Sequence, residues 1–148
     1  LQPDNLQAVV SQIELLDKQG KTDDSRQLLA RQLAAHPESA YLQHALGMWL
    51  LHHGERPYAL LGLSKAVELA PDNADYRYDL ATTLHAQDEV EAAQRQLEEI
   101  VQRDPANRKA RVLLVNYWKE TGQLQNVQVL LAQLEQQNPD DPALQQGL

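Results

Sequence analysis

The chain has 148 residues, of which 43% are hydrophobic and 23% charged, and its formal net charge is −8. These proportions are typical of a folded globular domain, and no biased tract suggests disorder. The negative charge makes nucleic acid and anionic lipid surfaces poor partners. The absence of cysteine excludes disulfides and thiolate metal sites, and the apolar runs are too short for membrane insertion.

Prolines recur every 34 residues along the chain, at Pro3, Pro37, Pro71, Pro105 and Pro139. Each predicts the end of a helix, because proline lacks an N–H and pushes the preceding residue toward extended geometry. A strong N-cap former stands two residues after each proline, so a new helix is expected there. These residues are Asn5, Ser39, Asn73, Asn107 and Asp141. The period predicts one domain over 1–148 with four repeats, 6–39, 40–73, 74–107 and 108–141.

A turn is predicted near the middle of every repeat. Gly20, Gly54, Asp88 and Gly122 recur with the same period, and such residues can adopt the left-handed conformation that closes a helix. Pro57 suits the first turn of the helix that follows Gly54. Each repeat therefore predicts two helices of roughly 13 residues.

Apolar residues at helical spacing predict the buried face of each helix. In the second repeat they are Leu42, Leu46, Trp49 and Leu50 against Ala59, Leu63, Ala66 and Val67. In the third they are Tyr76, Leu80, Ala81 and Leu84 against Ala93, Leu97, Ile100 and Val101. In the fourth they are Leu114, Val115 and Trp118 against Val127, Leu131 and Leu134. Val115 and Val127 replace small residues at the helix crossing, so this last pair is expected to be slightly wider.

The pattern Leu46-Gly47, Gly54, Ala59, Leu63, Ala66 and Pro71 resembles that of the tetratricopeptide repeat family. The resemblance covers residues 6–141 and implies an all-α fold, an α-α superhelix of about eight antiparallel helices. Residues 142–148 are expected to form a short capping helix, with Leu144 and Leu148 as its apolar contacts. The first repeat departs from the pattern at Gln12-Ile13, Ser25 and Gln32, so we expect it to be a looser end of the array.

Motifs for catalysis or metal binding are incomplete. Gly20-Lys21-Thr22 lacks the first glycine of a phosphate-binding loop, and Gly62-Leu63-Ser64 lies within a predicted helix rather than on a strand-to-helix turn. The histidines His36, His44, His52, His53 and His85 lack the i, i+4 spacing of a helical zinc site, although His52 and His85 could approach each other across adjacent first helices. We therefore predict no enzyme, no cofactor and no metal.

A second stripe on the first helix of each repeat is a candidate binding surface, because in the family it lines the concave groove that holds peptide segments. The predicted partner-binding residues are Tyr41, His44, Met48, Leu51, Asp75, Tyr78, Thr82, His85, Lys109, Val112, Asn116 and Lys119. Val10, Glu14 and Asp17 occupy the same stripe in the first repeat. The charge along the predicted groove changes from negative at Glu14 and Asp17 to positive at Lys109 and Lys119. Only Lys109 and Asn116 match the residues with which some family members clamp chaperone tails, so such a clamp is not expected.

The leading hypothesis is a non-catalytic protein-protein interaction module of bacterial origin, acting as a scaffold or chaperone through its groove. A second hypothesis makes the chain an accessory segment of a larger bacterial enzyme or of a c-type cytochrome assembly or multihaem protein. A third is self-association through exposed end helices. Residues 1–5 resemble the end of a further repeat, so we expect a fragment of a longer chain.

Overall fold

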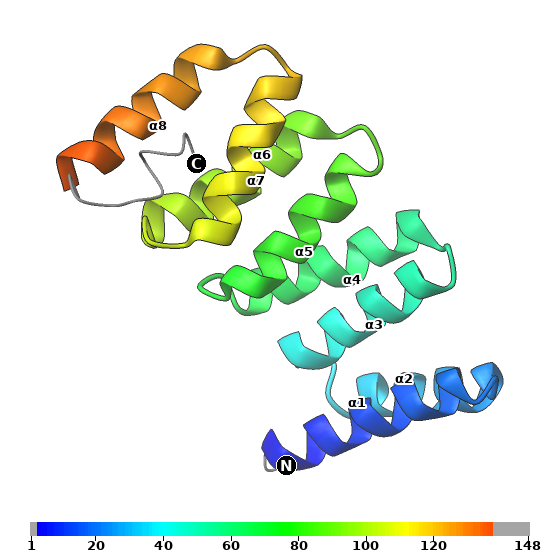
Figure 1. Cartoon of the computed structure of the whole chain (residues 1–148). Helices are drawn as coiled ribbons and strands as arrows, with labels where there is room; N and C mark the ends of the chain where they lie inside the picture. The colour runs from blue at the N-terminus through cyan, green and yellow to red at the C-terminus, as the bar shows by residue number, and fades with distance from the viewer. Residues whose placement is uncertain (1–2, 138–148) are drawn as a thin grey trace. The chain divides into compact units, whose positions relative to one another are not determined.

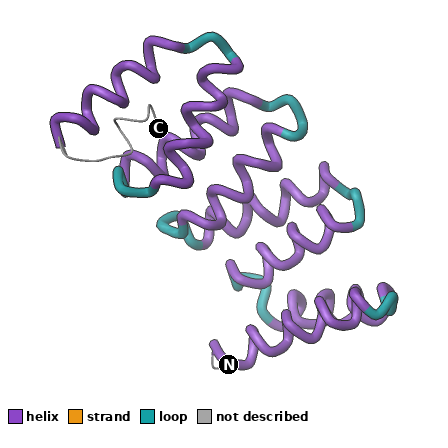
Figure 2. The backbone as a smooth tube through the Cα atoms, viewed as in Figure 1, coloured by secondary structure: helices purple, strands orange, loops and turns teal. Residues whose placement is uncertain are grey.

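The computed structural model describes residues 3–137 and contains only helices, turns and loops over that range (Figures 1 and 2). Its eight helices are α1 (Pro3–Lys18), α2 (Thr22–Ala35), α3 (Ala40–His52), α4 (Arg56–Leu69), α5 (Ala74–His85), α6 (Val90–Arg103), α7 (Arg108–Glu120) and α8 (Leu124–Gln137). The predicted all-α helical-repeat class is confirmed. Asp141, Leu144, Leu148 and the predicted capping helix over 142–148 lie outside the described residues.

The chain divides into two compact units, Leu1–Leu80 and Ala81–Leu148, and the boundary falls within α5. We call them the N-terminal and C-terminal units and describe each by itself. The expectation of one domain with repeats at the stated boundaries stays a prediction. None of the helices within 3–137 is both long enough and apolar enough to cross a membrane.

Three predicted N-caps are confirmed by their hydrogen bonds. The side-chain oxygens of Ser39, Asn73 and Asn107 each accept a bond from the amide three residues later, at 3.0 to 3.3 Å. These bonds satisfy an N–H that has no partner within its own helix. The prediction for Asn5 is wrong, because α1 already begins at Pro3 and Asn5 lies inside it. A proline is accommodated in a helical first turn, where the amide it lacks would have no partner.

The mid-repeat turns have the predicted left-handed backbone. Gly20, Gly54 and Gly122 have φ between +73° and +77°, and Asp88 has φ of +62°. Aspartate tolerates this region better than most non-glycine residues, which lets the third repeat turn without glycine.

The helices α3 and α4 approach very closely at two glycines. A Cβ atom on Gly62 would lie 2.9 Å from the carbonyl oxygen of Gln43 and 3.0 Å from the amide nitrogen of Gly47. A Cβ on Gly47 would lie 2.6 Å from Cγ of Leu63. The second repeat therefore packs its two helices backbone to backbone, with Leu63 fully buried beside them.

The predicted core is correct in most positions, including Leu42, Ala59, Leu80, Leu97 and Leu114, all of which are buried. Five residues predicted to be buried are only half-buried: Leu46, Trp49, Leu50, Tyr76 and Leu131. The apolar stripe on each helix is wider than its contact with the partner helix, so residues at the margin of the stripe keep an exposed edge.

The C-terminal unit leaves space between its last three helices. Buried Val115 and Val127 stand where the second repeat has Gly47 and Ala59. A cavity of about 590 Å³ lies between α6, α7 and α8, and Leu114 and Trp118 form part of its wall.

Candidate partner-binding site

A groove of about 430 Å³ runs between α1 and α3 in the N-terminal unit. Four apolar residues of its lining are buried or half-buried, and we call them the floor: Val10, Ile13, Ala45 and Trp49. The other lining residues are Glu14, Asp17, Lys18, Tyr41, His44, Met48 and His52. Three of the predicted site residues, Tyr41, His44 and Met48, thus line one cavity. The groove forms because α1 and α3 are the first helices of neighbouring repeats. Each packs one face against the second helix of its own repeat and turns another face toward the other first helix.

The groove offers apolar surface that water can reach. Ile13 is only 3% exposed at the floor, whereas the Met48 side chain at the rim is 41% exposed. A flexible thioether above an apolar floor can adapt to partner side chains of different shape. The groove is therefore suited to receiving an apolar side chain from outside.

Asp17 is tied into a polar network rather than pointing freely into the groove. Its side chain is 10% exposed, and its Oδ1 lies 3.0 Å from Nε2 of His53 and 3.3 Å from the hydroxyl of Ser25. The indole N–H of Trp49 donates to the same hydroxyl at 3.1 Å, and His52 Nε2 lies 3.6 Å from Asp17 Oδ2. This network joins α1, α2 and α3. Ser25, which departs from the family pattern, is fully buried and accepts one of the hydrogen bonds of the network.

His44 links α3 to the first turns of α5. Its Nε2 lies 2.7 Å from Oδ2 of Asp79, and its ring stacks on that of Tyr76 with 4.5 Å between centroids. The carboxylate can only accept, so the ring proton of this pair stands on Nε2 of His44. His44 thus orders the wall of the groove and has its polar edge already occupied.

Tyr76 packs against His44 and has a perturbed pKa. Burial raises the pKa of Tyr76 above its usual value, and the nearby Tyr41 and Asp75 raise it further. A phenolate beside a carboxylate and in poor contact with water is disfavoured, which explains the direction. Tyr76 contacts the groove through the stacking of its ring on that of His44, a lining residue.

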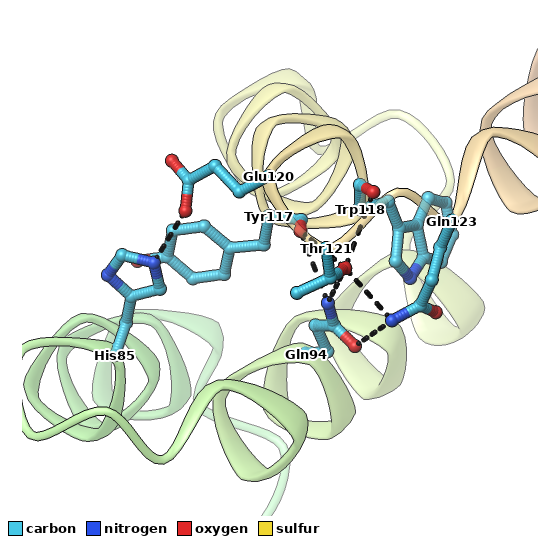
Figure 3. Close-up of polar contacts among 7 residues, drawn as sticks. All are labelled: His85, Gln94, Tyr117, Trp118, Glu120, Thr121 and Gln123. Atoms are coloured by element: carbon cyan, nitrogen blue, oxygen red, sulfur yellow. Dashed lines mark hydrogen bonds and ion pairs between the residues drawn. The ribbon is translucent and has the colours of Figure 1, made fainter.

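The C-terminal unit repeats the His44 arrangement with different residues. His85 Nε2 lies 2.8 Å from Oε2 of Glu120, and its ring stacks on Tyr117 at 3.9 Å with the planes 5° apart (Figure 3). In both units the carboxylate lies 35 residues after the histidine, and the tyrosine precedes the carboxylate by one helical turn. The same contact therefore joins α3 to α5 and α5 to α7.

A buried glutamine holds α6 to the turn after α7. Gln94 is 4% exposed, and its amide group donates to the carbonyl oxygen of Tyr117 at 3.3 Å and to the hydroxyl of Thr121 at 3.1 Å. Its carbonyl accepts from Gln123 at 3.0 Å, as Figure 3 shows. The NH2 group and the carbonyl oxygen of the Gln94 side chain therefore both have hydrogen-bond partners. The network orders the end of α7 rather than presenting a reactive site.

The other predicted residues do not line the groove. Leu51 and Tyr78 are half-buried and Asp75 is exposed in the N-terminal unit. In the C-terminal unit Lys109, Asn116 and Lys119 are exposed, whereas Thr82, His85 and Val112 are half-buried. The predicted charge gradient from Glu14 to Lys119 spans both units and stays a prediction.

Several groups that shape the groove were missed from the sequence, namely Ile13, Ala45, His53, Tyr76 and Asp79. The recurrence of a histidine and an acid at the same long spacing was the available signal for His44 and Asp79. Ser64 lies within α4, as expected for a residue outside a nucleophile turn. Over the range that the structure describes, no group of three or more histidine, aspartate or glutamate side chains is placed to hold a metal ion.

Comparisons with known proteins support the helical-repeat fold. A family model described as tetratricopeptide repeat matches residues 59–133. No curated protein matches the chain. Among solved structures, MamA is 20% identical with a TM-score of 0.68, and the match covers 82% of this chain and 71% of that one.

Two further structures are similar in fold. The first tetratricopeptide repeat domain of Spaghetti (RPAP3), bound to the HSP90 peptide SRMEEVD, is 17% identical with a TM-score of 0.67, covering 78% of this chain and 91% of that one. An O-GlcNAc transferase mutant from Thermobaculum terrenum is 25% identical with a TM-score of 0.63. That match covers 80% of this chain but only 23% of the transferase.

Proposed function

We propose, on the premise that the chain belongs to the tetratricopeptide repeat family, that it binds a segment of a partner protein in the groove between α1 and α3. The family supports a general role as a protein-interaction scaffold. The observation that carries the specific proposal is the groove of about 430 Å³, with an apolar floor and a half-exposed Met48 at its rim. In this role the chain acts without catalysis, as a scaffold or chaperone subunit.

The charges that line the groove differ in sign from those expected in a groove that binds an acidic peptide. The RPAP3 domain is bound to a peptide with two glutamates and one aspartate. In our chain the groove lining contributes Glu14 and Asp17 against a single cation, Lys18. Like charges facing each other across an interface are unfavourable, which supports a different class of peptide here.

A selection experiment tests the groove. The full chain is immobilised and used to select binders from a random peptide display library, and the selected peptides are then titrated against two variants. Met48→Glu places a charge at the rim and should abolish binding. Leu61→Glu makes the same change at a 69% exposed leucine on α4, outside the groove, and should leave affinity unchanged. Equal affinity for both variants would place the binding surface elsewhere.

A second candidate role is that of an accessory segment in a larger enzyme. The match to part of the O-GlcNAc transferase favours it, since there a fold like this one forms a minor share of a longer chain. The reading frame of the parent gene tests this directly. A catalytic domain in the same frame supports it, and a frame that encodes only repeats contradicts it. The haem-protein version of this alternative stays a prediction.

A further inference from the structure

The cavity of the C-terminal unit has walls that suit apolar side chains. It lies between α6, α7 and α8 and has a volume of about 590 Å³. Leu114, Leu130 and Leu134 are buried in its wall, whereas Val129, on the same stretch of α8, is 52% exposed. Within the described part of the chain, Glu98 is the one charged residue of the lining. An occupant with apolar side chains and no charge is therefore favoured.

A buried hydrogen-bond donor in the wall lacks an acceptor. Trp118 is 7% exposed and lines the cavity, and its indole N–H has no hydrogen-bond partner among residues 3–137. Figure 3 shows the hydroxyl of Thr121 donating to the backbone carbonyl of Trp118, whereas no bond reaches the ring nitrogen. A buried donor without an acceptor is unfavourable, so an occupant that brings a carbonyl oxygen to this point gains stability.

Trp118 marks one end of the cavity. It lies in the last turn of α7, and its carbonyl oxygen accepts a bond from the amide of Gln123, which directly precedes α8. Asn126 and Leu134 of α8 both line the cavity, and eight residues of helix place them about 12 Å apart. The cavity thus follows α8 from Trp118, near the beginning of that helix, to Leu134, one turn before its end at Gln137.

The sequence after α8 matches the cavity in composition and in length. Residues 142–148 are Pro-Ala-Leu-Gln-Gln-Gly-Leu and include no charged side chain. In the helix that the sequence predicts here, Leu144 and Leu148 share one face because they are four residues apart. Seven helical residues span about 10 Å, which is close to the length of the lining on α8.

The link between α8 and this predicted helix sets the direction of the helix. Residues 138–141, Asn-Pro-Asp-Asp, separate the two. Links of about two to five residues join antiparallel helices, so the segment is expected to run back along α8 with its C-terminal end toward Trp118. The last carbonyl oxygens of a helix have no partner within it, and one of them can therefore accept from the Trp118 indole.

Covalent attachment favours this occupant over a separate protein. The segment follows directly from Gln137, one turn beyond the lining residue Leu134. A short link keeps it at a high effective concentration beside the cavity. A helix of seven residues is unstable alone in water, so burial of its two leucines is what would stabilise it.

We propose that residues 142–148 occupy the cavity between α6, α7 and α8 as a short helix antiparallel to α8. Leu144 and Leu148 enter the cavity, and a carbonyl oxygen at the end of the segment accepts from the indole N–H of Trp118. The segment lies on the side of α8 that faces α6, instead of stacking beyond α8 as a further helix of the array. It thereby covers apolar surface that would otherwise be open to other chains. This inference does not rest on the groove between α1 and α3.

Cross-linking locates the segment, because the chain has no cysteine of its own. Gln145→Cys/Gln102→Cys pairs the segment with an exposed lining residue of α6. Gln145→Cys/Gln128→Cys is the matched control, since Gln128 is exposed and lies about half a turn from the lining residues Asn126 and Leu130. Each variant is treated with a short bismaleimide, and mass spectrometry follows the linkage within one chain. We expect the Gln102 pair to link about tenfold faster than the Gln128 pair.

Two further changes test the apolar face of the segment. Leu144→Asp/Leu148→Asp, the leucine-face variant, should slow the linkage to position 102 about tenfold, because the cavity would have to bury two carboxylates. Ala143→Asp/Gln146→Asp, the outer-face variant, adds the same charge away from the leucines and should leave the rate unchanged. Circular dichroism establishes that each variant retains its helices.

The fluorescence of Trp118 gives an independent measurement. The chain has two tryptophans, so Trp49→Phe leaves Trp118 as the single emitter. In this background the leucine-face variant should move the emission maximum to longer wavelength, because water enters the cavity beside the ring. The outer-face variant should not move it.

Three results would overturn the inference. The first is equal linkage of Gln145→Cys to the two partner positions, which would remove the preference for the side of α8 that faces α6. The second is a linked product that joins two chains, which would make a second copy the occupant. The third is unchanged linkage and emission in the leucine-face variant. None of these results bears on the groove, which is tested separately by Met48→Glu.

Discussion

Replacement of Asp17 by alanine is expected to destabilise the N-terminal unit far more than replacement of its neighbour Glu14. Asp17 accepts a bond from His53 with a side chain that is 10% exposed, and it lies 3.3 Å from the Ser25 hydroxyl, whose single proton is shared with the Thr22 carbonyl oxygen at 2.9 Å. Glu14, by contrast, is exposed one turn earlier on the same helix. A hydrogen bond to a charged group contributes about 1.5 to 3 kcal/mol, and its loss also leaves the half-buried His53 without its acceptor. We expect Asp17→Ala to lower the free energy of unfolding by about 2 to 3 kcal/mol.

Urea unfolding followed by far-ultraviolet circular dichroism measures this change, and Glu14→Ala is the matched control. The control makes the same substitution in the same helix, so the gain in helix propensity is similar and its own effect should stay within about 0.5 kcal/mol. The double variant Asp17→Ala/His53→Ala should lose less unfolding free energy than the sum of the two single variants, because each single change already removes the same hydrogen bond. Equal stability of Asp17→Ala and Glu14→Ala would refute the network as a source of stability.

Three further predictions follow from local geometry. Gly62→Ala should lower the free energy of unfolding by about 1 to 2 kcal/mol, because the new Cβ would meet the backbone of α3. Part of this loss is offset because alanine has a higher helix propensity than glycine. The control Ala30→Gly, at an exposed site of α2, measures that propensity difference. Tyr76 has a raised folded-state pKa, so its contribution to stability is complete below the ordinary tyrosine value of about 10 and is lost as pH rises further. Urea unfolding at pH 9 and pH 11 should therefore show a smaller alkaline loss in Tyr76→Phe than in the parent chain, and an equal loss would contradict the shift. Asn107→Ala removes an N-cap and should cost about 1 kcal/mol, visible as a lower midpoint in urea with an unchanged slope.

Local features that depend on residues close together in the sequence could be predicted from the sequence alone. The helix boundaries at Ser39, Asn73 and Asn107 follow from a side chain reaching an amide three residues away, and the turn at Asp88 from its own backbone preference. The start of α1 at Pro3 was missed because the proline was interpreted as the end of a preceding helix, whereas the same residue is equally suited to a first turn.

The contacts across repeats could not be predicted in the same way. Whether His44 faces a partner or the Asp79 carboxylate depends on the rotation of α3 relative to α5, which a helical period does not contain. For the same reason Asp17 was taken as a groove acid, although it is bonded inward to Ser25 and His53. The apolar stripe is also ambiguous at its margin, where Trp49 forms the floor of the groove.

These pairs change which groove residues are available for recognition. A polar group that already has a partner within the protein adds little to binding, because a ligand would have to replace a bond of similar strength. His44, Asp17 and Asp79 are committed in this way, and they fix the positions of the helices that form the groove. What remains for a partner is the apolar floor and the exposed Met48 and Glu14. Replacing the exposed Glu14 should therefore leave the groove folded, whereas removing Asp17 or Asp79 should weaken every ligand by loosening the helices that form the groove.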